Sequence, residues 1–176
     1  MFLGVVDTGA ITMVWAMAEL AKRPTLMKKA QDEVRTCIGN KVKVTESDTD
    51  QLQYLKMIVK ETLRLHPPAP MLLPRETISH FKDPEEFIPE RFMDSTIDFK
   101  GVHYELLPFG SGRRACPAIY MGTTTVELGL ANLFYHFDWK LPDGTKEQDI
   151  NMEEVAGVTL TVSKRTALNL IPEKFY

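Results

Sequence analysis

The sequence predicts a mainly α-helical domain with a small β-sheet, an α+β fold. Apolar residues recur at helical spacing over long segments, as at Leu26, Ala30, Val34 and Ile38. The C-terminal part, 138–176, instead carries turn signals and short apolar runs that suit strands. A chain of 176 residues is long enough for one such domain.

Composition and charge exclude several classes of protein. A net charge of -3 argues against a protein that binds nucleic acid by neutralising phosphates. The hydrophobic content of 44% supplies enough apolar surface for a packed core, so disorder is not expected. The two cysteines, Cys37 and Cys116, form neither a disulfide framework nor a zinc-finger spacing. They fit a reducing, intracellular compartment.

The first segment, from about Met1 to Lys22, is predicted to be a helix that stops before Pro24. Its uncharged run, Thr8 to Ala18, is too short to span a bilayer. The basic residues follow this run, which is the reverse of the order in a signal peptide. Because the chain is apolar from its first residue and has no helix cap, we expect it to start inside a buried helix.

Three further helices are predicted, from Thr25 to Gly39, from about Gln51 to Leu65, and from near Pro117 to about Phe137. Glycine closes the first, two prolines follow the second, and proline is a favoured first residue for the third. The connecting segments are a polar loop (40–50), an extended stretch (69–78) and proline-punctuated loops up to residue 108. One clear strand is predicted, Val158 to Val162.

The predicted helix 51–65 carries a charge among apolar residues. It has two apolar stripes on opposite sides, Leu52, Leu55, Val59 and Leu63 on one and Tyr54, Met57, Ile58 and Leu65 on the other. Glu61 falls in the second stripe, with Arg64 beside it. Most such pairs lie on the surface, but the apolar neighbours disfavour that here. A buried carboxylate must be paired and hydrogen-bonded, so we expect a buried network with a third member.

The loop from Phe109 to Pro117 combines two glycines and two arginines with Cys116, directly before a predicted helix. A helix N-terminus and nearby cations both favour a thiolate. A buried structural cysteine is the usual case, but these neighbours favour a nucleophile or a metal ligand. A nucleophile would need a base, for which His103 and His136 are the candidates. The spacings of a phosphate loop, a serine hydrolase and a closed metal set are absent.

These patterns together resemble the cytochrome P-450 family, in particular its plant microsomal members. The resemblance rests on four motifs in the family's order: Asp7-Thr8, which resembles the end of the oxygen-groove motif; Glu61-x-x-Arg64; Pro89-Glu90-Arg91-Phe92; and Phe109-x-x-Gly112-x-Arg114-x-Cys116. It covers essentially the whole chain. Family members are far longer, so the chain is similar to their C-terminal part only, with 1–22 as the central oxygen-groove helix, 109–118 as the haem-binding loop and 117–137 as the proximal helix.

The resemblance implies a haem-thiolate monooxygenase that inserts one atom of O2 into an apolar small molecule. Electrons would come from NADPH through a flavoprotein reductase, at the cytosolic face of the endoplasmic reticulum membrane, with the membrane anchor outside this chain. Cys116 would be the axial ligand of the haem iron. The other implied roles are proton delivery by Asp7 and Thr8, haem packing and binding by Phe109, Gly112, Arg114 and Arg75, completion of the Glu61–Arg64 network by Arg91, and a substrate pocket lined by Ala69, Pro70, Met71, Leu72 and Leu73.

Three features depart from the family pattern. Val5 and Ala118 replace expected glycines, and Ser79 to Pro84 runs straight on where the family has a sheet-and-helix insert. A haem-binding or inert product without catalysis is therefore an alternative, and a cysteine-dependent enzyme is a weaker one. We also expect the first helix, without neighbours, to fray.

Overall fold

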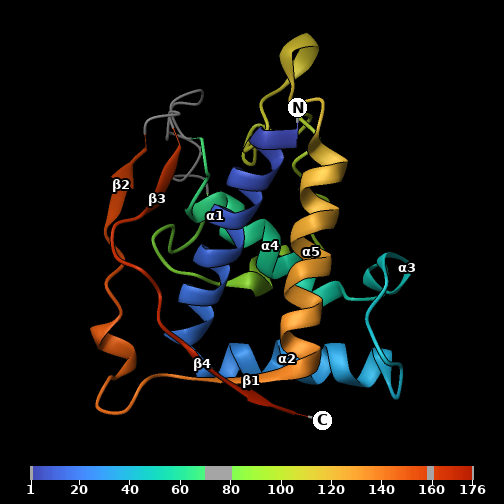
Figure 1. The fold of residues 1–176 in the computed structure, drawn as a ribbon. Helices are drawn as coiled ribbons and strands as arrows, with labels where there is room; N and C mark the ends of the chain where they lie inside the picture. Colours follow the sequence, from blue (N-terminus) through green and yellow to red (C-terminus); the bar gives the residue numbers. More distant parts are fainter. Residues whose placement is uncertain (1, 70–80, 158–160, 176) are drawn as a thin grey trace.

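The computed structural model describes residues 2–69, 81–157 and 161–175 as a cluster of helices with two small sheets at its edge (Figure 1). Helices α1 (Phe2–Ala21) and α5 (Ile119–His136) run side by side, and α4 (Gln53–Leu65) packs against both. Helix α2 (Pro24–Ile38) crosses beneath their ends. The predicted fold class, mainly α with a small β component, is confirmed.

Both sheets are two-stranded and antiparallel. Strand β1 (Phe137–Lys140) pairs with β4 (Ile171–Lys174), and β2 (Glu154–Ala156) pairs with β3 (Val162–Lys164). The predicted strand Val158–Val162 meets β3 only at its last residue, and 158–160 lie outside the described residues. Strands β1, β2 and β4 were not predicted, because each has only three or four residues and little alternation.

The helix ends differ from prediction by one or two residues at most. Gly39 closes α2 with a φ of 62°, and its N–H donates to Arg35 O at 3.0 Å. The predicted polar loop 40–50 contains a further short helix, α3 (Glu46–Thr49), because Thr45 and Asp48 form a capping box. Helix α5 begins at Ile119 rather than near Pro117.

Three 3-10 turns complete the described elements. They are η3 (Pro89–Phe92), η4 (Gly112–Arg114) and η5 (Glu147–Asp149). The first packs against α4, and the second lies within the cysteine loop. These two turns therefore lie in the segments where the sequence places functional residues.

The core lies where the four long helices meet. Its largest fully buried side chains include Trp15, Leu20, Leu55, Ile58 and Phe134. Residues 15–21 of α1 are all buried, whereas Val6 and Val14 on its outer side are exposed. The expectation that this helix lacks neighbours is wrong, because α5, α4, α2 and β3 all contact it.

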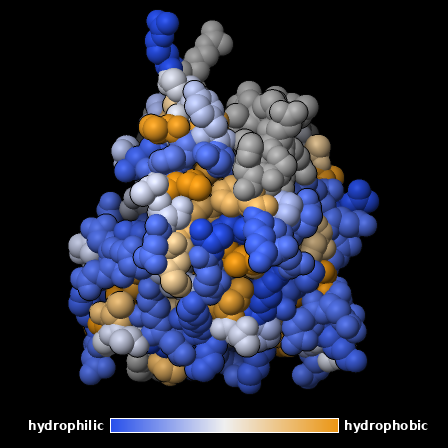
Figure 2. Space-filling view, turned by 180° about the vertical axis from the view of Figure 1, so that it is seen from behind, coloured by the Kyte–Doolittle hydropathy of each residue, from blue (hydrophilic) through white to orange (hydrophobic). Residues whose placement is uncertain are grey.

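The rear face of the molecule is largely polar (Figure 2). Figure 2 shows hydrophilic residues over most of the rear face, with apolar patches between them near its middle. Among the described residues, no helix combines the length and the hydropathy needed to cross a membrane.

Candidate functional site

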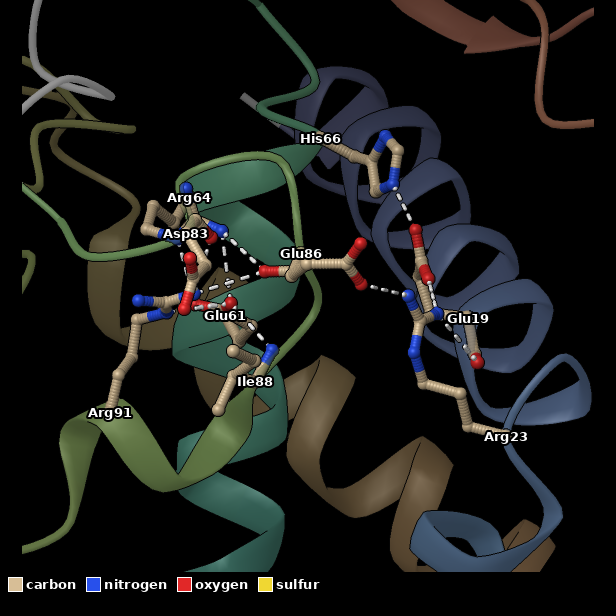
Figure 3. Close-up of polar contacts among 9 residues, drawn as sticks. All are labelled: Glu19, Arg23, Glu61, Arg64, His66, Asp83, Glu86, Ile88 and Arg91. Atoms are coloured by element: carbon tan, nitrogen blue, oxygen red, sulfur yellow. Dashed lines mark hydrogen bonds and ion pairs between the residues drawn. The ribbon is translucent and has the colours of Figure 1, made fainter.

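Glu61, Arg64 and Arg91 converge on the side of α4 that faces η3 (Figure 3). The Glu61 side chain is fully buried. Arg64 binds it in a two-pronged contact, with Nε 2.8 Å from Oε2 and Nη2 2.9 Å from Oε1. Arg91 Nε donates to Oε1 at 2.9 Å. The structure thus brings together the buried pair predicted from the apolar stripes and the third charge that the family resemblance supplied.

The remaining donors of this cluster bind the main chain of the segment before η3. Arg64 donates to Pro84 O at 2.8 Å, and Arg91 donates to Lys82 O at 2.8 Å. The Ile88 N–H donates to Glu61 Oε1 at 2.8 Å. Because the charges are paired and saturated with hydrogen bonds, the cluster holds residues 82–91 against α4. We call the cluster of Glu61, Arg64 and Arg91 the clamp, because its side chains form hydrogen bonds to protein groups and play a structural part.

A second buried polar cluster lies beside the first and was not predicted from the sequence. His66, at the end of α4, donates from Nε2 to Glu19 Oε1 of α1 over 2.7 Å. Glu19 also pairs with Arg23, and Arg23 Nη2 reaches Glu86 Oε2 at 3.4 Å. The main-chain oxygen of Glu86 accepts from Arg64 and Arg91 at 3.1 and 3.0 Å. Glu86 therefore joins the two clusters (Figure 3).

Burial and pairing oppose each other in this second cluster. Burial disfavours the charged form of Glu19, but its contacts with His66 and Arg23 outweigh burial and lower the pKa of the carboxyl. Burial likewise disfavours a charged His66, yet the facing carboxylates of Glu154 and Glu19 raise the pKa of the imidazole. The carboxylate of Glu19, directly after the uncharged run of the first helix, was the available signal for this cluster.

The cysteine loop folds back on itself. The N–H of Cys116 donates to Phe109 O at 2.8 Å, which closes the loop. Gly110 and Gly112 have φ angles of 72° and 64°, a conformation that side chains disfavour. Cys116 is half-buried and lies three residues before α5. The expectation that it sits at the helix N-terminus is corrected, because Pro117 and Ala118 separate it from the first helical residue.

Gly101 belongs to this loop although sequence reasoning overlooked it. Its φ is 89°, and a Cβ there would lie 3.1 Å from Gly110 O and 3.2 Å from the Cα of Ser111. Only glycine allows the chain at 101 to pack so closely against the cysteine loop. A lone glycine in a polar loop gives no periodic signal, so the sequence alone did not reveal it.

A small cavity lies between α1, α5 and the first residue of the cysteine loop. Its volume is about 20 Å³, and its lining includes Thr8, Gly9, Val59, Phe109 and Gly122. Phe109 also packs edge-on against Phe99, with ring centroids 5.7 Å apart. The structure therefore places Thr8, predicted to help deliver protons, and Phe109, predicted to pack on the haem, around one cavity. It can hold about one water molecule.

The other predicted site residues are distributed differently. Asp7 is exposed on α1, Gly112 is exposed in the loop, and Ala69 is half-buried. Arg75 and the pocket residues Pro70, Met71, Leu72 and Leu73 lie outside the described residues, as does the side chain of Arg114.

The donor chemistry of these residues fits a haem, whereas the cavity volume does not. A cysteine in a glycine-opened loop, an aromatic ring and apolar walls suit a porphyrin with a thiolate ligand. The cavity between the described side chains is far smaller than a porphyrin. The residues therefore match a haem in the type of ligand that they offer. A bound haem would require more space beside α1 than this cavity provides.

Comparisons with known proteins agree with this combination of motifs. A family model described as Cytochrome P450 matches residues 1–80 and 78–169. Three Arabidopsis thaliana proteins are similar to the chain: Cytochrome P450 71B34, 56% identical over 196 residues; Cytochrome P450 71B35, 55% identical over 195; and Cytochrome P450 71B26, 55% identical over 200. These matches cover 96 to 98% of this chain but only 39 to 40% of the relatives.

The matches also locate an internal gap. Alignments of 195 to 200 residues exceed the 176 residues of the chain, so the relatives have residues that this chain lacks between matched positions. The family model breaks at residues 78–80, where the sequence shows the junction between Ser79 and Pro84. On the extent of this match, the chain belongs to the cytochrome P450 family.

Proposed function

We propose that this chain carries the haem-binding part of a monooxygenase that inserts one atom of O2 into an apolar small molecule. Bound haem with a cysteine ligand would supply an electron-rich iron that favours O–O cleavage. The observation that carries the proposal is the closed loop from Phe109 to Cys116, with two glycines at positive φ, beside the cavity that Thr8 lines.

Each residue would contribute through its own chemistry. The Cys116 thiolate would bind the iron, and amides of the loop would moderate its charge. Phe109 would pack against the ring, while Arg114 and Arg75 suit haem carboxylates by their planar guanidinium groups. Thr8 and Asp7 would hold and pass protons, Thr8 at the cavity and Asp7 at the solvent side. Residues 69–73 would line the substrate pocket.

The whole protein's partners follow from the same proposal. An NADPH-dependent flavoprotein reductase would supply the electrons, and the substrate would be apolar. We place the whole protein at the cytosolic face of the endoplasmic reticulum membrane, attached by a segment other than those described. Its matched relatives are more than twice as long as this chain, so these are properties of the longer protein.

A second candidate function is haem binding without efficient catalysis. Two observations favour it: the cavity beside Thr8 is water-sized, and Val6 on the first turns of α1 is 64% exposed. Productive oxygen chemistry needs an enclosed site from which water is excluded. Among the described residues, little covers the outer side of α1, where Val6 and Val14 are exposed.

The test is to express the 176-residue chain, add haem, reductase and NADPH, and measure both NADPH consumption and product from several apolar compounds. We expect haem uptake that depends on Cys116, with much more NADPH consumed than product formed. Cys37→Ser is the matched control, because Cys37 is exposed on α2 and should not affect uptake. Failure to bind haem at all would overturn the first proposal, and tightly coupled turnover would overturn the second.

A further inference from the structure

His66 stands where three elements meet. It ends α4, its Nε2 lies 2.7 Å from Glu19 of α1, and its Nδ1 lies 3.5 Å from Glu154 Oε1 of β2. Its exposed fraction is only 8%. The ring stacks on Trp15, with centroids 4.0 Å apart and planes 3° from parallel. Both ring nitrogens therefore face carboxylates inside the protein.

The two protonation states of this ring make different contacts. Imidazolium has two N–H donors, one for each carboxylate, while neutral imidazole has one. Because Glu19 is the nearer partner, a neutral ring would donate there and would turn a lone pair toward Glu154. Stacking on indole also favours the cation. Loss of the proton would thus weaken the contact to β2 selectively.

The charges around the ring favour the same state. Glu19 comes from α1, and Arg23 from the N-cap of α2. Glu154 comes from β2, and Glu86, which contacts Arg23, from the loop before η3. On β3, Lys164 lies opposite Glu154 in the register, with its ammonium donating to Thr166 O at 3.1 Å. Carboxylates outnumber the cations directly around His66 as long as the ring is neutral.

The hairpin formed by β2 and β3 has a second attachment at the same place. The N–H of Val162 donates to Pro68 O at 2.9 Å, two residues after His66. The hairpin, the end of α4 and the chain that leads into residues 69–73 are therefore held at one point. A change at His66 would reach the start of the segment that we propose as the pocket lining.

We propose that His66 is a proton-operated latch: its charged ring ties α1 and the β2–β3 hairpin to the end of α4, and loss of the proton releases the hairpin. The contribution to stability is fully present below the unfolded pKa of 6.5 and is lost as pH rises through the raised pKa of the folded state. The latch is independent of haem and of the proposed function, because it lies in the polypeptide alone.

The test is a pH titration of the 176-residue chain from about pH 5 to about pH 9. Trp15 emission is followed in a Trp139→Phe background, so that a single indole reports. A charged imidazole quenches an indole stacked on it, so emission should rise with a midpoint above 6.5. Glu154→Gln should lower that midpoint, whereas Glu153→Gln, which alters an exposed neighbour paired with Arg165, should not.

A second measurement needs no substitution. Nitrogen NMR of the His66 ring should show both nitrogens protonated below the midpoint and one above it. The protection factors of the Val162 and Gly157 amides should fall through the same midpoint, because both amides hold the hairpin. A His66 midpoint at or below 6.5, or an emission midpoint that Glu154→Gln leaves unchanged, would overturn the proposal.

Discussion

Charged residues differ greatly in importance according to where they lie. The Lys28–Asp32 pair is 74% and 57% exposed, and such pairs contribute little to stability. Glu61 and Arg64 are 0% and 2% exposed, and Arg64 would be an uncompensated buried charge without Glu61. Substitutions of charged residues should therefore destabilise the fold most in the clusters around Glu61 and Glu19.

Replacing Glu61 by Gln should lower the free energy of unfolding by about 3–5 kcal/mol, because two guanidinium groups lose their carboxylate. Urea unfolding monitored by circular dichroism measures this loss. Glu85→Gln is the matched control, since Glu85 is an exposed residue of the segment held by the cluster. It should change stability by less than roughly 0.5 kcal/mol. Equal effects of the two substitutions would contradict the account of the clamp.

The pKa of the Asp48 carboxyl provides a second test at the scale of single residues. The hydrogen bond from Lys41, followed by those from Thr45, lowers the pKa of the Asp48 carboxyl from 3.8 to about 2. A depressed pKa stabilises the fold above 3.8 and loses that effect as pH falls through about 2. Lys41→Met should move the midpoint of an NMR titration of this carboxyl upward. Lys43→Met, at an exposed neighbour, should leave it in place; a midpoint unaffected by Lys41→Met would be contrary evidence.

Sequence reasoning found one buried cluster and missed the other for a physical reason. The pairing of Glu61 and Arg64 is local, three residues apart on one helix. Their burial follows from apolar residues on both sides of that helix. Glu19 pairs with His66, which is 47 residues away, and nothing local marks the contact. Periodicity reports which face is buried but does not report which distant residue completes it.

At the scale of elements, the contacts between helices supply what local capping lacks. Helix α4 has no side-chain cap from its own N-cap residue, Leu52. Glu33 of α2 caps the helix instead: its carboxylate accepts hydrogen bonds from the N–H groups of Tyr54 at 2.7 Å and Leu55 at 3.0 Å. A carboxylate at a helix N-terminus satisfies free donors and complements the helix dipole. Glu33 thereby fixes α4 to α2.

Replacing Glu33 by Gln should cost about 1–2 kcal/mol of stability, since charge-assisted bonds to two amides are weakened. The exchange rates of the Tyr54 and Leu55 amides should rise with it, which hydrogen exchange measures directly. Asp32→Asn, on the exposed side of the same helix, should change neither quantity appreciably. Unchanged protection of both amides in Glu33→Gln would show that α4 is capped in another way.

The long helices were predictable, whereas most strands were not. Helices α2 and α4 carry apolar residues at helical spacing with clear stops, and their ends lie within two residues of prediction. Strand β1 follows α5 without a break, and its partner β4 places Pro172 opposite Trp139. A strand that contains proline and is exposed throughout has no local signature. It forms because it pairs with a segment some thirty residues earlier.

At the scale of the whole molecule, the cluster around Glu61 is fully formed beside the internal gap. Residues 78–80 mark the break in the family match, yet Arg91 still reaches Glu61 at 2.9 Å across a shortened connection. The segment 82–91 binds α4 through its own carbonyl groups, the Ile88 N–H and the two guanidinium groups around Glu61. The clamp is therefore a self-contained unit, and the gap lies next to it without interrupting it.

The cysteine loop carries the central claim, because a role in binding haem iron distinguishes a haem protein from a cysteine-dependent enzyme. Its sequence identified Cys116, while its closure, the part played by Gly101 and the distance from α5 required the structure.

The measurement that tests this claim most directly is an absorption spectrum of the haem-loaded chain, reduced under carbon monoxide. A thiolate ligand gives a strongly red-shifted Soret band, since it donates more charge than imidazole. We predict this band in the unaltered chain and in Cys37→Ser, and its loss in Cys116→His. An unchanged band in Cys116→His, or its absence from the unaltered haem-loaded chain, would contradict the assignment of Cys116 as the iron ligand.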